Sequence, residues 1–216
     1  MSLLRAYLIS GFLGLIFACS TSEVAPVLPY YNTPDFEPQF FENKEKAEAK
    51  ITHHLKPFSF LDQHGHSVSD TLLRGKVHVA NFFFSRCTNI CANMIKQMRV
   101  IESEFGQNAE VEMLSFSVTP WLDSVSVLKK YAQKNNIKSK HWHLLTGDKN
   151  AIYTLARKSY FAEENLGFTK DNSQFLHTEH VVLVDKTLRI RGIYNGSLGL
   201  EMEQLVKDIK LLLAEK

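Results

Sequence analysis

Several marks of common protein classes are scarce or missing in this sequence. The 25 basic and 23 acidic residues nearly balance, and no basic run is dense enough to follow a phosphate backbone, so nucleic acid is not an expected partner. Internal repeats and low-complexity tracts are absent, and a composition of 44% hydrophobic and 22% charged residues argues against a disordered or fibrous chain. At 216 residues the chain is long enough for one domain and a tether, and too short for two ordinary domains.

The apolar segment near the N-terminus lacks the length of an ordinary membrane-spanning helix. It covers residues 6–18, between Arg5 and Cys19, whereas a spanning helix needs about 20 residues. Such a length fits the apolar core of a signal peptide. Residues 16–19 (IFAC) resemble the lipobox of bacterial lipoproteins, in which the cysteine becomes the lipidated first residue, although Phe17 is bulkier than that motif prefers.

We therefore expect residues 1–19 to be a lipoprotein signal and Cys19 to carry lipid. The domain would then lie outside the cytoplasm, on the periplasmic side, anchored to a membrane. An uncleaved N-terminal anchor is the alternative.

The next segment has no sustained helical or strand period. Residues 20–49 hold four of the six prolines, and we expect them to form an extended linker. The domain is expected over residues 50–216. It should begin with a small hairpin over residues 58–69, where alternating sequence surrounds a turn.

The rest of the domain alternates between strand and helix patterns. An apolar, aromatic-rich run at residues 76–84 has the length of a strand buried on both faces. The spacing of the apolar residues predicts further strands at 112–118, 143–146, 181–184 and 188–194, and helices at 91–105, 124–135, 149–160 and 201–213. This order predicts an α/β fold with helices packed on a central sheet.

With Cys19 assigned to the signal, two cysteines are left in the domain. Cys87 and Cys91 lie four residues apart where the first buried strand gives way to a helix, so both sulfurs project on one side. The positive end of a helix favours thiolate, which is both the metal-binding and the nucleophilic form. The spacing also permits a redox-active disulfide between Cys87 and Cys91.

The chemistry of this pair favours copper. Two thiolates select Cu(I), and one added imidazole makes a site that can also hold Cu(II). A structural zinc site would need four closed ligands, and the chain has no second cysteine pair. A structural disulfide is the plainer alternative in an exported protein.

Nine histidines are available to complete such a site. His177 stands just before a predicted buried strand, where loops at strand ends supply site residues. His141 and His143 bracket Trp142 and are expected at the surface, with a second, weak metal site as the alternative. The others are expected to be solvated or packed, and stand at positions 53, 54, 64, 66, 78 and 180.

Taken together, these motifs resemble the Sco/SenC family. The resemblance spans residues 58–216 and rests on Cys87-x-x-x-Cys91 after a strand and on His177 before a late strand. Supporting matches are the segments 82–87 (FFFSRC), 117–120 (SVTP) with Asp123, 128–132 (LKKYA) and 142–147 (WHLLTG).

The resemblance implies a thioredoxin-like fold with a central mixed sheet flanked by helices and an N-terminal hairpin. It also implies one copper ion on Cys87, Cys91 and His177. The implied role is that of a metallochaperone rather than an enzyme, serving the binuclear copper site of cytochrome c oxidase through the subunit that bears it.

Three positions depart from the family pattern. Thr88 and Ala92 stand where many relatives have proline after each cysteine, and Thr119 replaces an aspartate, removing a charge that could help docking or tune the site. His180 is an added histidine; in an extended strand it would face away from His177, so it is left out of the site.

Two other functions use the same cysteines. A thiol-disulfide oxidoreductase or redox sensor needs no copper, although the common catalytic dithiol has two residues between its cysteines rather than three. A peroxiredoxin-like peroxidase would have Thr or Ser at position 84, where this chain has Phe84.

Overall fold

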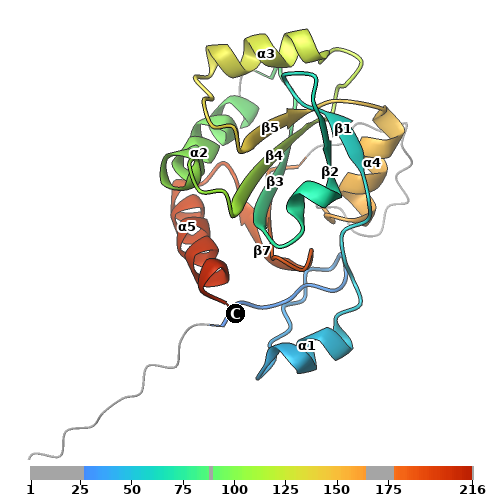
Figure 1. Cartoon of the computed structure of the whole chain (residues 1–216), viewed down its shortest axis with the longest axis vertical. Helices are drawn as coiled ribbons and strands as arrows, with labels where there is room; N and C mark the ends of the chain where they lie inside the picture. Colours follow the sequence, from blue (N-terminus) through green and yellow to red (C-terminus); the bar gives the residue numbers. More distant parts are fainter. Residues whose placement is uncertain (1–26, 88–89, 164–177, 216) are drawn as a thin grey trace, which may run out of the picture.

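A computed structural model describes residues 27–87, 90–163 and 178–215. A five-stranded mixed sheet forms its centre, in the order β5-β4-β3-β6-β7 (Figure 1). Strands β3 (Val77–Phe83), β4 (Val111–Ser117) and β5 (Trp142–Leu145) are parallel, whereas β6 (His180–Val184) and β7 (Ile190–Asn195) alternate in direction. Every residue of β3 and β4 is buried, as their apolar composition predicts for strands covered on both faces.

Helices cover both faces of the sheet. Helices α2 (Ile90–Phe105) and α5 (Gly199–Ala214) pack side by side, and with α3 (Val125–Lys134) they bury one apolar cluster against it. Helix α4 (Lys149–Lys158) contributes to the second cluster, together with the hairpin of β1 (Ser59–Leu61) and β2 (Ser67–Ser69) and the short 3-10 helix η1 (Asp70–Leu73). In Figure 1, α2 and α5 lie on one side of the sheet and α4 with the hairpin on the other.

The predicted fold is confirmed. The predicted hairpin pairs Phe60 with Val68, and each predicted strand and helix is present. Side chains at the helix starts explain two of the boundaries: Ser124 accepts a hydrogen bond from the Val127 amide, and Asp148 accepts one from the Ala151 amide.

The segment that precedes the hairpin differs from the extended linker that the sequence predicts. We call residues 27–51 the N-terminal strap. Tyr30 exchanges two backbone hydrogen bonds of 2.9 Å with Gln39, and the Tyr31 amide donates to the Ile190 carbonyl at the start of β7. The strap ends in helix α1 (Lys44–Lys50), and its side chains Leu28, Tyr30, Ala47 and Ile51 are buried.

Arg191 fastens the strap to the sheet. Its guanidinium donates to the carbonyls of Leu28 and Pro29 at 3.0 Å, lies 3.9 Å from the Tyr30 ring centroid, and forms two hydrogen bonds with Glu215 at the end of α5. This packing explains why residues with no regular sequence period are ordered: their partner comes from a strand about 160 residues later.

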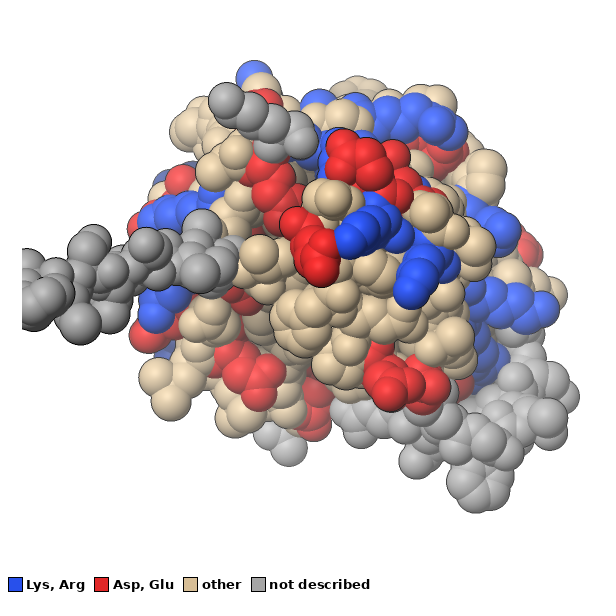
Figure 2. All heavy atoms as spheres, turned by 90° about the horizontal axis from the view of Figure 1, so that it is seen from below, with Lys and Arg blue, Asp and Glu red and all other residues tan. Residues whose placement is uncertain are grey.

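Figure 2 shows the surface from below the view of Figure 1. On this face, acidic and basic side chains are interspersed around an uncharged central area, so neither sign dominates. Among the described helices, none has the length and apolar character needed to cross a membrane.

Candidate metal and redox site

The two cysteines lie at the carboxyl edge of the parallel strands. Cys87 is in the loop that leaves β3, and Cys91 is the second residue of α2. Both are thiols rather than halves of a disulfide, and their side chains are hydrogen-bonded to each other. Cys91 is buried and Cys87 is half-buried, so a metal ion or a partner thiol would reach the pair from the Cys87 side.

The predicted activation of the thiols by the helix start is wrong for Cys91. The pKa of the Cys91 thiol is raised to about 11, mainly by burial and to a smaller extent by the adjacent Cys87. The backbone amide of Phe84 opposes this shift but does not overcome it. Cys91 is therefore a neutral thiol near neutral pH, and a metal ion that binds it must displace its proton.

A buried carboxylate supports the cysteine loop from the neighbouring strand. Asp123 is 0% exposed and accepts hydrogen bonds from the hydroxyls of Ser85, Ser117 (2.5 Å) and Thr119 (3.0 Å). In the part of the chain described, no Lys, Arg or His forms an ion pair with this carboxylate. Because β3 and β4 are parallel, the loops after them emerge at one edge, which brings Ser85 and Asp123 together.

Thr119 therefore has a structural explanation at the position where many relatives carry aspartate. Its side chain is 2% exposed and donates to Asp123, so it is not a surface group available for docking. The sequence marks Asp123 and Ser85 only as parts of family motifs. Their contact joins residues 38 positions apart, and local sequence gives no signal for it.

Tyr131 on α3 lies within electrostatic range of the dithiol. The centroid of its ring lies 5.3 Å from the ring centroid of Phe83, the last residue of β3. Burial raises the pKa of Tyr131, and Cys91, Cys87 and Asp123 raise it further, in that order. Tyr131 is thus a neutral, mostly apolar neighbour of the cysteines.

The third predicted ligand, His177, lies outside the described residues, as does the predicted lipidation site Cys19. The sheet register nevertheless shows where the chain returns: Val181 of β6 is paired with Asn81 of β3 in an antiparallel register, so the start of β6 lies at the edge where the cysteine loop begins. Thr178 is buried there and accepts a hydrogen bond from the His180 amide. The ring of His180 packs edge-on against Phe36 of the strap.

The predicted surface position of His141 and His143 is wrong. His141 is 8% exposed, and both rings contact the carboxylate of Glu112, His141 Nδ1 at 3.2 Å and His143 Nε2 at 3.2 Å. Lys76 Nζ completes this cluster at 2.6 Å from Glu112. Glu112 and Lys76 lie at the beginning of β4 and just before β3, at the opposite edge of the sheet from the cysteines.

The two histidines lie against Glu112 because a buried carboxylate is unfavourable unless hydrogen-bond donors surround it. Burial alone would raise the pKa of Glu112, but the hydrogen bonds from His143, Lys76 and His141 lower it overall. Among the described residues, no group of three or more His, Cys, Asp and Glu side chains is arranged to hold a metal ion. The predicted copper site has only two of its three ligands in that part of the chain.

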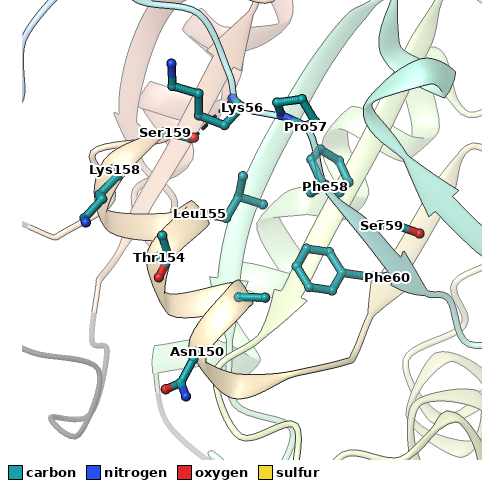
Figure 3. A pocket seen from close by; sticks show the side chains of 11 residues that line it. Lys56, Pro57, Phe58, Ser59, Phe60, Asn150, Thr154, Leu155, Lys158 and Ser159 are labelled. Carbon is teal, nitrogen blue, oxygen red and sulfur yellow. Dashed lines mark hydrogen bonds between the residues drawn. The ribbon is translucent and has the colours of Figure 1, made fainter.

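A cavity of about 470 Å³ opens between α4 and the segment that leads into β1 (Figure 3). Phe58, Phe60 and Leu155 line it, with Lys56 and Lys158 also on its wall, and the Lys56 amide donates to Ser159 Oγ at 3.2 Å. No cysteine lines this cavity, so it is separate from the dithiol.

Comparisons with known proteins agree on one family. The SCO1/SenC family model matches residues 46–214. A SCO1 protein homolog of Bacillus subtilis is 30% identical over 168 residues, covering 77% of this chain and 86% of that protein.

Solved structures give the same result. The crystal structure of a SCO1/SenC family lipoprotein from Bacillus anthracis has a TM-score of 0.65 at 29% identity, covering 76% of this chain and 97% of that one. BsSco is described as having a disulfide switch and as a member of the Sco family of cytochrome c oxidase assembly proteins. Its structure has a TM-score of 0.63 at 28% identity, covering 76% of this chain and 95% of that one. The structure of Bradyrhizobium japonicum ScoI with copper bound has a TM-score of 0.58 at 25% identity, covering 74% of this chain and 99% of that one.

Proposed function

Because this chain belongs to the SCO1/SenC family, we propose that it is a membrane-tethered metallochaperone that carries copper on Cys87, Cys91 and His177. Copper is its cargo, and the acceptor is the copper-bearing subunit of cytochrome c oxidase. Structures of relatives with copper bound and the description of BsSco as an oxidase assembly protein support this proposal.

The dithiol is the observation that carries the proposal. Two thiols in mutual contact at the end of a buried strand offer the soft ligand pair that Cu(I) prefers. Because Cys87 is half-buried, the pair is open on the Cys87 side, as transfer to an acceptor requires. Since the pKa of Cys91 is raised, its thiol is protonated until the ion arrives, and binding of the ion to Cys91 releases a proton.

His177 would supply the nitrogen ligand. The antiparallel pairing of β6 with β3 puts His180, the first residue of β6, at the end of the sheet where the cysteine loop begins, and this supports the assignment of a histidine close to it in sequence. Imidazole adds affinity for Cu(II), so three ligands would let one site hold both oxidation states.

Lipid at Cys19 would hold the domain on the periplasmic side of a membrane. The description of the Bacillus anthracis relative as a lipoprotein supports this part of the proposal. A single acyl chain binds membranes only marginally, so the several chains of a bacterial lipoprotein would be needed.

A second function uses the same dithiol to reduce a disulfide or to sense redox state. The disulfide switch described for BsSco favours it. In that case the acceptor's copper-binding cysteines, rather than copper itself, would be the substrate, and the chain would maintain them as thiols. The two functions differ in whether copper or two electrons are transferred.

Anaerobic titration of the reduced full chain with Cu(I) tests the first function. We expect one tight site per chain, none after oxidation of the pair to a disulfide, and none in the Cys87→Ser/Cys91→Ser variant. Equal copper affinity before and after oxidation would disprove the proposal. Copper-independent reduction of an oxidised acceptor peptide by the same chain would favour the second function.

A histidine pair tests the third ligand. The His177→Ala variant should lose the thiolate-to-copper absorption of the Cu(II) form and still bind Cu(I), because two thiolates alone can hold Cu(I). His180→Ala is the matched control and should leave the Cu(II) spectrum unchanged. The opposite pattern would assign the ligand to His180.

A further inference from the structure

Asp123 connects the cysteine loop to the neighbouring strand. Two of the hydroxyls that it binds, from Ser117 and Thr119, belong to its own β4–α3 turn. The third, from Ser85, belongs to the loop that carries Cys87. Among the described residues, the Ser85 bond is therefore the one that crosses from the carboxylate to the metal loop.

Backbone groups of this loop contact both cysteines. The Cys87 amide donates to the Phe84 carbonyl at 3.0 Å, which closes a turn around Ser85. The Phe84 amide is hydrogen-bonded to the Cys91 side chain. Ser85 thus lies between Phe84, whose amide contacts the Cys91 side chain, and Cys87 itself. Holding Ser85 in place therefore limits how far the two sulfurs can move relative to each other.

We propose that Asp123 is a positioning residue for the dithiol, acting through Ser85 to hold the Cys87 loop in the geometry that receives a metal ion. This rests on the proposed function, since it assigns a supporting group to the proposed copper ligands. The carboxylate suits this role because it is fully buried and is held in place by the Ser117 and Thr119 hydroxyls of its own turn. Groups that orient metal ligands are most effective when they are themselves held rigid.

Three variants of the full chain, purified in detergent, separate this role from general stabilisation. Ser85→Ala removes the bond to the loop, and Ser85→Thr restores a hydroxyl at the same place. Ser103→Ala is the matched control, because it removes the hydroxyl of an exposed serine on α2 that donates to the Val100 carbonyl of its own helix and not to Asp123. Ser85 is only half-buried, so its variants should fold.

The first measurement is amide hydrogen exchange of residues 84–87 in the reduced, metal-free chain. In Ser85→Ala this exchange should speed up by about tenfold, the factor that corresponds to loss of one hydrogen bond to a charged group. Ser85→Thr should return it toward the original rate, and Ser103→Ala should leave it within about twofold of that rate, since the Ser103 hydroxyl shares no hydrogen-bond partner with Ser85.

The second measurement is Cu(I) affinity by competition with a chelator. Ser85→Ala should lose about 10- to 100-fold, the usual effect of removing a partner that orients a metal ligand, and the threonine variant should recover it. Equal affinities for Ser85→Ala and Ser103→Ala would overturn the proposal, and so would faster exchange with unchanged affinity. If the unaltered chain binds no copper, the proposed function fails, and exchange alone decides whether Asp123 positions the loop.

Discussion

Burial gives Cys91 a chemistry different from that of an exposed cysteine at a helix start. Its raised pKa, about 11 against an ordinary value of 9.0, lowers the thiolate fraction at neutral pH by about 100-fold. A thiol of this kind is a poor nucleophile until a metal ion removes its proton, which fits metal capture better than rapid disulfide exchange.

Alkylation measures this property directly. At pH 7, iodoacetamide should modify Cys91 in the folded, metal-free chain about 100-fold more slowly than in the same chain unfolded in urea. Because only the thiolate reacts, the folded rate should keep rising up to about pH 11. Peptide mass spectrometry distinguishes the three cysteines, and a folded rate that levels off near pH 9 would contradict the raised pKa.

Glu112 gives the fold a pH dependence. Its pKa is lowered on folding, so its contribution to stability is present above the pKa of the unfolded carboxyl and is lost as pH falls through the folded value. Glu112→Gln leaves Lys76, the buried His141 and the half-buried His143 without their carboxylate and should reduce the free energy of unfolding by about 3 kcal/mol at pH 7.

Urea denaturation at several pH values tests this contribution. The difference between Glu112→Gln and the original chain should shrink as the pH falls below about 4. The exposed Glu110 offers a matched control, and Glu110→Gln should change stability by less than about 0.5 kcal/mol at any pH. A pH-independent difference would show that lost packing, rather than charge, explains the effect.

Residue spacing predicted the cysteine pair but not its environment. Cys87 and Cys91 could be placed at a strand end because four-residue spacing and apolar runs are local signals. The contacts of His141 and His143 could not be predicted in the same way, since they are made with Glu112, about 30 residues earlier in the chain. The Ser85 contact with Asp123 has the same long-range origin.

At the scale of elements, periodicity located each strand and helix of the sheet domain. The N-terminal strap was missed because each of its parts buries only two side chains, Leu28 and Tyr30 in one and Ala47 and Ile51 in the other, too few to establish a period. Arg191 lies over the Tyr30 ring, and its guanidinium makes four hydrogen bonds to the carbonyls of Leu28 and Pro29 and to the carboxylate of Glu215. The strap is therefore part of the folded unit rather than a spacer in front of it.

Two truncations test this conclusion. A chain that begins at Val27 should unfold like the full domain. A chain that begins at Lys50, where the domain was expected to start, should lose about 3 to 5 kcal/mol, because the burial of Leu28 and Tyr30 and several hydrogen bonds to Arg191 are lost. Equal urea midpoints for the two truncated chains would show that the strap adds nothing to stability.

For the whole molecule, the proposed anchor can be tested by mass. If Cys19 is lipidated, the membrane fraction should contain a mature chain that starts at Cys19 with the added mass of the acyl groups. Cys19→Ser should stop this processing and leave copper binding by the domain unchanged, because the strap and the dithiol lie beyond it in the chain. An unmodified cysteine, or retention of Met1, would instead indicate a plain N-terminal anchor.

The strap also sets how far the dithiol can travel. It joins the sheet at the start of β7, which runs parallel to β3, whereas the cysteines follow the end of β3, so attachment point and dithiol lie at opposite ends of the strands. The seven residues of β3 span about 20 Å, and the chain from Cys19 to Leu28 can extend by at most about 30 Å. If the domain is tethered by lipid at Cys19, the copper site can then lie at most about 50 Å from the point where the lipid enters the membrane. An acceptor whose copper centre lies higher above the bilayer would be out of its range, however strong its affinity.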